Sequence, residues 1–336
     1  MRIFFNLLKC KVINLVLVMG GLILWSIPAT AGPKITATLA SVNTAEYINP
    51  KMQLLFIKKV KEKTNGGLDI QWVGSGQLGG LKENLEAIMA GNLEMCGVNN
   101  ANLGPLFSET QLFDLPFIFR DYAHMRSVSR GPIGQNVYDR LEKATGIKLI
   151  MTGLPDGARS VWNRKRPVRT PADIKGLKLR VMQAPIMVAT FAALGAIPTP
   201  MSSTEVYLAA KQGVIDGAEW GPAGMIQQKS YETAKYYTLT KHFNMPGSVA
   251  VNSEWFDSLP NNYQVAILVS AEEARMWFDK TFDADEEAAL KQLYELGMEI
   301  IENPDTAPFR EAVKPVYDEY AKAAGGWDMI NAVIAY

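Results

Sequence analysis

The alternation of apolar and polar residues is clearest over residues 177–182, where leucine and valine alternate with lysine, arginine and methionine. A period of two predicts a strand that carries its aliphatic side chains on one face and Arg180 on the other. Residues 170–173 have the form of a helix N-cap followed by proline, and Gly176 can adopt the positive φ that ends such a turn. We therefore expect Arg180 on a rigid strand that follows a tight turn.

The segments before this strand alternate between short apolar runs and stretches of helical periodicity. This order is the βαβ pattern of a mostly parallel sheet. An apolar run interrupted by proline at 113–119 is expected to form a packed loop. The predicted strands are 34–40, 68–73, 93–98 and 148–154, and the predicted helices are 43–63, 81–90 and 123–145.

A second alternating block begins near residue 157, and a helical region follows it. Residues 261–301 carry apolar side chains at helical spacing with little punctuation, which predicts one long helix, straight or kinked near 283–285. A helix of that length would cross more than one domain. The predicted strands of this block are 161–163, 177–182, 197–198, 214–220, 236–239 and 248–251, and its helices are 185–194 and 204–212.

The first 31 residues have the pattern of a secretory signal peptide. Three basic residues and no acidic residue precede an apolar run at 12–27. Residues 29–31 form an A-x-A cleavage site. The run is short for a membrane span, which needs about 20 apolar residues. We expect export and cleavage after Ala31, with an uncleaved N-terminal anchor as the alternative.

Composition narrows the range of functions. The full chain has 34 basic and 34 acidic residues, and the predicted leader holds three of the basic ones, so the mature chain has a net charge near −3. Neither nucleic acid nor an acidic membrane surface is an expected partner, because both need basic fields. Cleavage would leave Cys96 without a second cysteine, so we expect it to be a buried small hydrophobe.

Residues 74–79 match the dinucleotide-binding pattern G-x-G-x-x-G, but their context argues against a cofactor. The end of the next predicted strand holds Asn99 and Asn100 where the ribose needs an acid. Export also removes the chain from nicotinamide cofactors. We expect a glycine-rich turn and no cofactor.

Catalytic motifs are also missing. His124 and His242 are the only histidines, and neither has a second residue spaced to share a metal ion. No H-E-x-x-H or G-x-S-x-G motif occurs. Glu205, Asp216 and Glu219 could serve acid–base chemistry, but each fits a cap, turn or positioning role better. The sequence therefore shows no sign of an enzyme, and we expect no metal site.

Three predicted strand ends carry groups suited to a ligand. A guanidinium such as that of Arg180 can clamp a carboxylate or phosphate, although a surface arginine is the plainer interpretation. Arg159 follows another strand at the join between the two blocks. Trp220, between glycine and proline at 216–222, forms either a binding wall or part of the core.

The chain as a whole resembles the periplasmic solute-binding subunit of TRAP (tripartite ATP-independent periplasmic) transporters. The resemblance rests on ordered motifs that cover nearly all of the mature chain. It implies an α/β, two-domain periplasmic binding protein-like fold (type II-like) with crossing strands and a long domain-spanning C-terminal helix. The motifs are Gly76–Gly79, Phe113–Phe117, Gly157–Arg159, Arg166–Pro167, Gly176–Val181, Gly195–Ala196, Pro198–Met201, Glu205–Tyr207 and Val214–Gly217.

The resemblance also implies a division of the chain into two lobes. Lobe I would comprise 32–156 and 245–285, and lobe II would comprise 157–244 and 286–336. The ligand would be held between the lobes as they close and then passed to the TRAP permease in the membrane. The mature chain itself would not insert into the membrane.

By the same resemblance, Arg180 pairs bidentately with a ligand carboxylate and Arg159 supports it from the same lobe. Trp220 replaces an asparagine of relatives that bind sugar acids, which disfavours a sialic-acid-like ligand and favours a flatter or less hydroxylated acid, or one packed against an indole. Some relatives with Glu-Trp here hold a metal ion beside the acid, but we see no full ligand set. The expected ligand-binding residues are Arg180, Arg159, Trp220, Asn99, Glu219, Tyr207, Met201, Asn43, Ser41 and Asn102.

The expected function is thus that of an extracytoplasmic receptor for a small organic acid. An aromatic or amino-acid-like acid is an alternative ligand. A sensory binding protein is an alternative role, and a periplasmic enzyme is the alternative from another class. The enzyme would need a nucleophile–base pair or a metal cluster near Arg180.

Overall fold

A computed structural model describes residues 34–336, which form one compact unit. The predicted signal peptide and its cleavage site lie outside these residues. Within 34–336, no helix combines the length and the apolar character that a membrane span requires.

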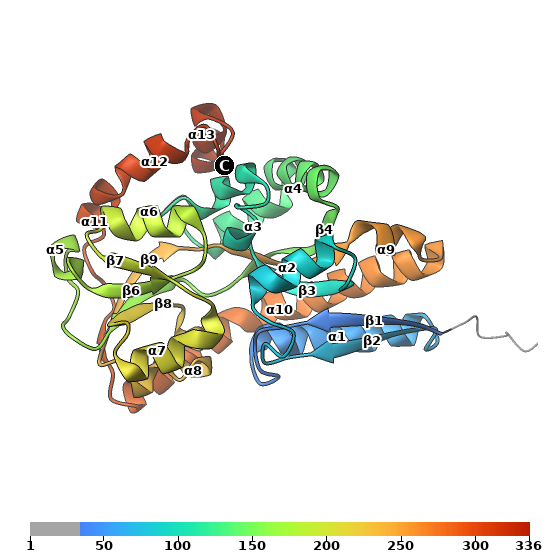
Figure 1. The fold of residues 1–336 in the computed structure, drawn as a ribbon, viewed down its shortest axis with the longest axis horizontal. Coiled ribbons are helices and arrows are strands. Elements are labelled where there is room, and N and C mark those ends of the chain that lie inside the picture. Colours follow the sequence, from blue (N-terminus) through green and yellow to red (C-terminus); the bar gives the residue numbers. More distant parts are fainter. Residues whose placement is uncertain (1–33) are drawn as a thin grey trace, which may run out of the picture. The chain divides into compact units, whose positions relative to one another are not determined.

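The strands form two mixed sheets (Figure 1). The first has the order β2-β1-β3-β10-β4, in which β1 is parallel to β2 and β3 while β10 is antiparallel to β3 and β4. Its strands are β1 (Ile35–Ala40), β2 (Leu68–Val73), β3 (Met95–Asn99), β4 (Ile147–Pro155) and β10 (Pro246–Asn252).

The second sheet has the order β11-β9-β5-β8-β6-β7. The pairs β11–β9, β6–β7 and β6–β8 are parallel, and β5 runs antiparallel to both β8 and β9. Its strands are β5 (Arg159–Asn163), β6 (Lys178–Val181), β7 (Ile197–Pro200), β8 (Gly217–Trp220), β9 (Tyr236–Phe243) and β11 (Glu299–Ile301).

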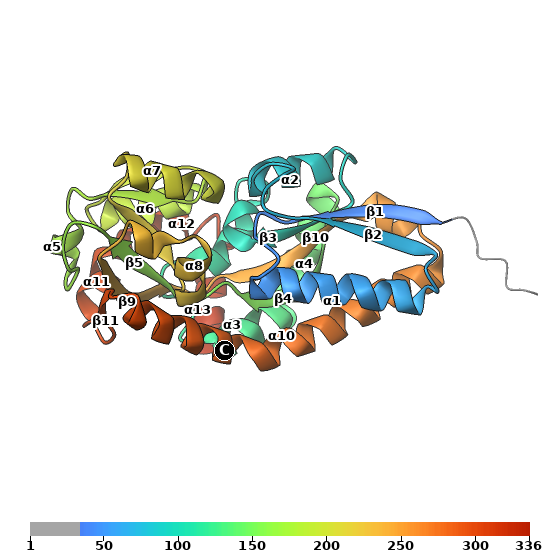
Figure 2. The ribbon, with the colours of Figure 1, turned by 90° about the horizontal axis from the view of Figure 1, so that it is seen from below.

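The helices cover both sheets (Figures 1 and 2). Short 3₁₀ turns at 100–102, 108–114, 203–205 and 230–232 complete the connections. The α-helices are α1 (Ile48–Lys63), α2 (Leu81–Met89), α3 (Tyr122–Arg130), α4 (Pro132–Thr145), α5 (Pro171–Ile174), α6 (Pro185–Ala193), α7 (Val206–Gln212), α8 (Pro222–Gln227), α9 (Ser253–Ser258), α10 (Asn261–Glu295), α11 (Ala307–Ala312), α12 (Lys314–Tyr320) and α13 (Trp327–Ala335).

The chain passes three times between the two sheets, twice through strand connections and once along α10. It leaves the first sheet at the end of β4 and enters the second at β5 through residues 156–158 only, and it returns between β9 and β10. The 35-residue helix α10 contacts α1 and β4 beside the first sheet and α8 beside the second, as Figure 2 shows along its length. The sheets are therefore linked by short strand connections and one long helix.

Each sheet packs its own apolar core. Residues of β1, β2, β10, α1 and α10 form one cluster, in which Phe56 and Phe278 are fully buried. A second cluster joins Trp162 and Tyr237 of the other sheet to Leu293 near the end of α10. A third, larger cluster includes most of 113–119, which is the packed loop that the sequence predicts. Cys96 is buried as expected, and burial raises the pKa of its thiol to about 12.

Several of the predicted strands and helices differ from those in the structure. The sheets are mixed and not mostly parallel, because β10, β5, β8 and β9 make antiparallel pairs. The predicted helix 123–145 is two helices separated at Gly131, before Pro132. The predicted helix 43–63 begins only at Ile48, and the residues before it form a loop.

The long C-terminal helix is present but shorter than predicted. It is continuous through 283–285 and ends at Glu295, because Gly297 has a φ of +81° that an α-helix does not accept. The chain then adds β11 beside β9. The turn before β6 is as predicted, with the carboxylate of Asp173 accepting from the backbone N–H of Thr170 at 2.8 Å.

We predict that Phe278→Ala lowers the free energy of unfolding by about 3–5 kcal/mol, because it leaves a cavity where α10 meets the first core. Met276→Ala on the same helix is the control, since Met276 is 47% exposed. Urea unfolding followed by circular dichroism measures both. Equal losses in the two variants would show that the core does not depend on this face of α10.

Candidate functional site

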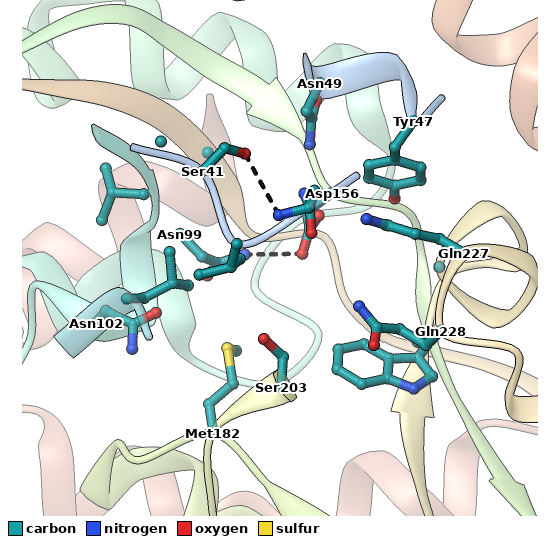
Figure 3. Close-up of a pocket in the computed structure, with 18 of the residues that line it drawn as sticks. Ser41, Tyr47, Asn49, Asn99, Asn102, Asp156, Met182, Ser203, Gln227 and Gln228 are labelled. Atoms are coloured by element: carbon teal, nitrogen blue, oxygen red, sulfur yellow. Dashed lines mark hydrogen bonds between the residues drawn. The ribbon is translucent and has the colours of Figure 1, made fainter. Parts of the chain in front are cut away.

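A cavity lies where the strand ends of the two sheets meet (Figure 3). The first sheet supplies the residues after β1, β3 and β4 and the start of β10, and the second supplies the ends of β6 and β8 and the loop after β7. Strand ends of α/β sheets are the usual place for ligands. The polar lining residues are Ser41, Asn43, Tyr47, Asn49, Gln53, Asn99, Asn102, Asp156, Arg159, Arg180, Gln183, Ser202, Ser203, Trp220, Gln227, Gln228 and Ser248.

Arg180 lines the cavity, and only part of its guanidinium donates hydrogen bonds to other described residues. Its Nε and Nη2 both donate to the carbonyl of Met201, at 2.9 and 2.8 Å, and this carbonyl fixes the side chain. Nη1 is buried and has no hydrogen-bond partner among the described residues. Both N–H bonds of Nη1 and one of Nη2 therefore remain, which is the edge that a carboxylate can contact bidentately.

The charge of Arg180 also lacks a direct counter-ion. The side chain is 2% exposed, and no carboxylate within residues 34–336 comes within 4.0 Å of its nitrogens. Burial lowers the pKa of Arg180 to about 9, with Glu219 opposing the shift and Arg159 adding to it. The group thus remains a cation at neutral pH, and a buried cation without a partner is costly.

Arg159, in contrast, is fully paired. Its Nε and Nη2 bind the two carboxylate oxygens of Glu219, and Nη1 donates to Oδ2 of Asp156 at 2.8 Å. Burial alone would lower the pKa of Arg159, but Glu219 and Asp156 raise it. Arg159 is therefore paired with both Glu219 and Asp156, and among residues 34–336 Arg180 is the arginine of the cavity without a carboxylate in direct contact.

His242 lies beside Glu219 but adds no charge to the site. Its Nε2 lies 3.9 Å from Oε2 of Glu219, and its Nδ1 shares a hydrogen bond of 2.7 Å with the hydroxyl of Thr240. Burial, and secondarily Arg159, lowers the pKa of His242 to about 3. The imidazole is therefore neutral at neutral pH.

Trp220 ties the two arginines together. In the strand order β5-β8-β6, the central strand carries Trp220 and its neighbours carry Arg159 and Arg180. The guanidinium carbon of each arginine lies 5.0 Å from the centre of the indole ring. Trp220 is 7% exposed and belongs to the second core as well as to the cavity wall, so it is both of the alternatives that the sequence left open.

The cavity wall holds several buried polar atoms without partners among the described residues. Native proteins pair nearly all such atoms with protein groups, water or a ligand, so this cavity can offer them to water or to a polar ligand. They are Asn49 Oδ1, Asn102 Oδ1, Arg180 Nη1, Trp220 Nε1 and Gln227 Nε2. Figure 3 shows Asn49, Asn102 and Gln227 on different sides of the same space.

Most of the predicted site residues come together in this cavity. The lining includes Arg180, Arg159, Trp220, Asn99, Met201, Asn43, Ser41 and Asn102. Glu219 does not line it, because its carboxylate lies behind Arg159 with 0% exposure. Tyr207 does not line it either, because α7 directs its hydroxyl to Glu232, at 2.6 Å.

Sequence reasoning missed ten of the polar lining residues, among them Asp156, Tyr47, Gln227 and Gln228. Asp156 immediately precedes the Gly157–Arg159 motif, so its position beside Arg159 was available as a signal. Tyr47 lies before α1 in what was expected to be helix. Gln227 and Gln228 lie at the end of α8, a helix that the sequence did not predict.

Two glycines and a buried carboxyl lie behind the cavity. A side chain on Gly157 would come within 2.6 Å of the Cα of Gly221, so the two connecting segments can cross only as glycines. Beneath them, Oε1 of Glu286 on α10 accepts from the backbone N–H of Ala223 at 3.1 Å. Burial raises the pKa of Glu286 to about 8, and Asp156 adds to the shift.

The loop at 74–79 forms a glycine turn, as expected. Gly76 and Gly79 have positive φ, and an added side chain on Gly76 would meet Thr204 at 2.8 Å. Among residues 34–336 no group of three or more histidine, cysteine or acidic side chains is placed to hold a metal ion.

Two sheets joined by crossing strands, with a polar cavity between their strand ends, define a ligand-binding protein. The family model described as "Bacterial extracellular solute-binding protein, family 7" matches residues 39–323. The chain is 32% identical over 316 residues to the C4-dicarboxylate-binding periplasmic protein DctP of Rhodobacter capsulatus, covering 92% of this chain and 93% of that protein. It is 31% identical to the 2,3-diketo-L-gulonate-binding periplasmic protein YiaO of Escherichia coli K12, covering 97% and 99%.

Solved structures point to the same class of protein as these relatives do. A TRAP periplasmic solute-binding protein from Xanthobacter autotrophicus Py2, with bound β-D-galacturonate, superposes with a TM-score of 0.84 at 32% identity, covering 89% of this chain and 99% of that one. A second from Roseobacter denitrificans, with bound β-D-glucuronate, gives 0.86 at 30% identity, covering 89% and 99%. The chain belongs to this family of TRAP solute-binding proteins, which confirms the fold class and the expectation that it is not an enzyme.

We predict that Glu286→Gln stabilises the protein at pH 8 and has little effect at pH 4. The pKa of Glu286 is about 8 in the folded protein and about 4.3 in an unfolded chain, so the native carboxyl stabilises only below pH 4.3 and that contribution is lost as the pH rises to 8. The difference in the free energy of unfolding between Glu286→Gln and the wild type should grow by about 1.4 kcal/mol per pH unit between these two pKa values.

Urea unfolding of both proteins at pH 4, 6 and 8 measures this difference. Glu287→Gln, on the exposed side of α10, is the matched control and should show no such trend. A Glu286→Gln curve parallel to the wild-type curve at all three pH values would contradict the raised pKa.

Proposed function

We propose that this protein binds a small organic acid in the cavity, with the ligand carboxylate on Arg180. The observation that carries the proposal is the buried guanidinium, which within residues 34–336 has a free two-nitrogen edge and no direct counter-ion. A carboxylate supplies both the missing charge and the missing acceptors. Four relatives named above support the class, because each is named for, or holds, an organic acid.

The cavity favours a hydroxylated acid over the less hydroxylated one that the tryptophan at 220 suggested. Its wall carries many neutral amides and hydroxyls, which can donate to and accept from hydroxyl groups. Arg180 is the cation available to the carboxylate of such an acid, because Arg159 is already paired with Glu219. The galacturonate and glucuronate of the two solved structures are acids of this kind.

The proposed receptor works by closure of two lobes. Lobe I comprises 32–156 with 245–285, and lobe II comprises 157–244 with 286–336. Contacts of one ligand to both lobes would shift the protein toward the closed form. The amides at 99 and 102 would come from lobe I, and Arg180 from lobe II.

The proposed location is the periplasm, reached through the signal peptide with cleavage after Ala31. There the loaded protein would deliver its acid to a TRAP-type membrane permease. The periplasmic relatives support this location.

We predict that Arg180→Ala abolishes acid binding and that Arg180→Lys weakens it at least about a hundredfold. A charge-assisted bidentate contact contributes about 3 kcal/mol or more, and lysine offers a point charge without the fork. Isothermal titration calorimetry against a panel of uronates, aldonates and C4-dicarboxylates measures the change.

Arg169→Ala is the matched control, because Arg169 is exposed and does not line the cavity. Circular dichroism establishes that each variant is folded. Wild-type affinity in Arg180→Ala would sink the proposed carboxylate clamp.

A further inference from the structure

A glycine turn beside the first sheet meets a loop of the second sheet at the edge of the cavity. Residues 74–80 connect β2 to α2, and residues 201–205 connect β7 to α7. A side-chain carbon added to Gly76 would lie 2.8 Å from Cγ2 of Thr204, and one added to Gly80 would lie 2.8 Å from Oγ of Ser202. The two segments are thus in van der Waals contact, and a side chain at either glycine would force one segment to move.

The turn is fixed to the part of the first sheet that lines the cavity. The backbone N–H of Gly76 donates to the carbonyl of Ser41 at 3.0 Å, and the N–H of Ser75 donates to the carbonyl of Asn43 at 2.8 Å. Ser41 and Asn43 both line the cavity. A displacement of the turn would therefore move this wall of the cavity with it.

The loop is fixed to Arg180. The carbonyl of Met201 accepts the two hydrogen bonds from Arg180 described above, and the N–H of Met201 donates to the carbonyl of Val181 at 3.2 Å. Figure 3 shows Ser203 of this loop and Ser41 of the first sheet on different sides of the same cavity. The loop therefore links the proposed carboxylate clamp to the contact with the turn.

The contact between the turn and the loop is steric. Within residues 34–336 no hydrogen bond joins 74–80 to 201–205, and the loop pairs its polar groups internally. The backbone N–H of Ser202 donates to Oε2 of Glu205 at 2.9 Å, and the hydroxyls of Ser202 and Thr204 share a hydrogen bond of 3.0 Å. Such a contact blocks closer approach but offers little resistance to separation.

We propose that Gly76 and Gly80 are positioning residues for ligand binding, because their lack of side chains lets the two lobes close far enough for one acid to contact both Arg180 and the wall at Ser41 and Asn43. This inference rests on the proposed function, since it assumes that the acid is bound by lobe closure. It gives the glycine-rich turn, which matches a dinucleotide-binding pattern, a role in acid binding.

A methyl group at position 76 would hold the lobes apart at this edge. Two carbons in ordinary contact lie about 3.5–4.0 Å apart, so the turn and the loop would have to separate by about 1 Å. Hydrogen bonds from both lobes to one ligand weaken steeply over such a displacement. We expect Gly76→Ala to weaken acid binding at least about tenfold, and Gly80→Ala to act in the same direction.

Isothermal titration calorimetry of the wild type and both variants tests the proposal. The probe is whichever of D-glucuronate, D-galacturonate, D-gluconate and succinate binds the wild type most tightly. Gly91→Ala is the matched control, because Gly91 has a φ of +72°, close to the +67° of Gly76, while nothing in the described part of the chain lies within 4 Å of the added carbon. Both positive-φ variants should lose stability in urea unfolding, whereas only Gly76→Ala should lose affinity.

A double variant separates a contact between the lobes from local damage to the turn. Thr204→Ser removes Cγ2 and keeps the hydroxyl that pairs with Ser202. Gly76→Ala combined with Thr204→Ser should therefore recover most of the lost affinity, to within about threefold of Thr204→Ser alone.

Two results would overturn the role of the glycines: wild-type affinity in folded Gly76→Ala and Gly80→Ala, or a loss of affinity that Thr204→Ser does not restore. If Gly76→Ala fails to fold, wild-type affinity in Gly80→Ala alone overturns it, because Gly80 has an ordinary φ of −79° and its variant carries no backbone strain. If none of the four acids, nor any other acid of the panel, binds the folded wild type, the proposed function itself fails.

Discussion

The site depends on a buried guanidinium that has no direct counter-ion in the part of the chain that the structure describes. Arg180 is held by the carbonyl of Met201 and keeps one edge of its fork free. Such a cation destabilises a folded protein unless another group compensates it, so the structure carries a cost that an anion can remove. Binding of an acid would thus stabilise the protein as well as fill the cavity.

The strand order of the second sheet produces this arrangement. Because β8 lies between β5 and β6, one indole faces two guanidiniums, and antiparallel pairing of β5 with β8 brings Glu219 against Arg159. One arginine is therefore neutralised and rigid, and the other remains available. The resemblance assigned both arginines to the ligand, whereas the contacts separate a structural ion pair from a candidate clamp.

The sequence predicts local elements well and spatial pairing poorly. The turn before β6 and the long helix α10 depend on neighbouring residues, and both were predicted. The antiparallel insertion of β10 between β3 and β4 is set by contacts across about 100 residues or more, which periodicity does not encode. The same limit applies to the site: Tyr207 belongs to a known motif but points to Glu232, while Asp156 enters the cavity through the crossing of the chain at Gly157.

The most direct test of the central claim is a crystal structure of the protein with the tightest-binding acid of the panel. The account predicts that the carboxylate of that acid lies on the free edge of Arg180, within hydrogen-bond distance of Nη1, while Arg159 keeps its pairing with Glu219. A ligand whose carboxylate lies among the amides at 99 and 102, with Nη1 of Arg180 still unpaired, would contradict it.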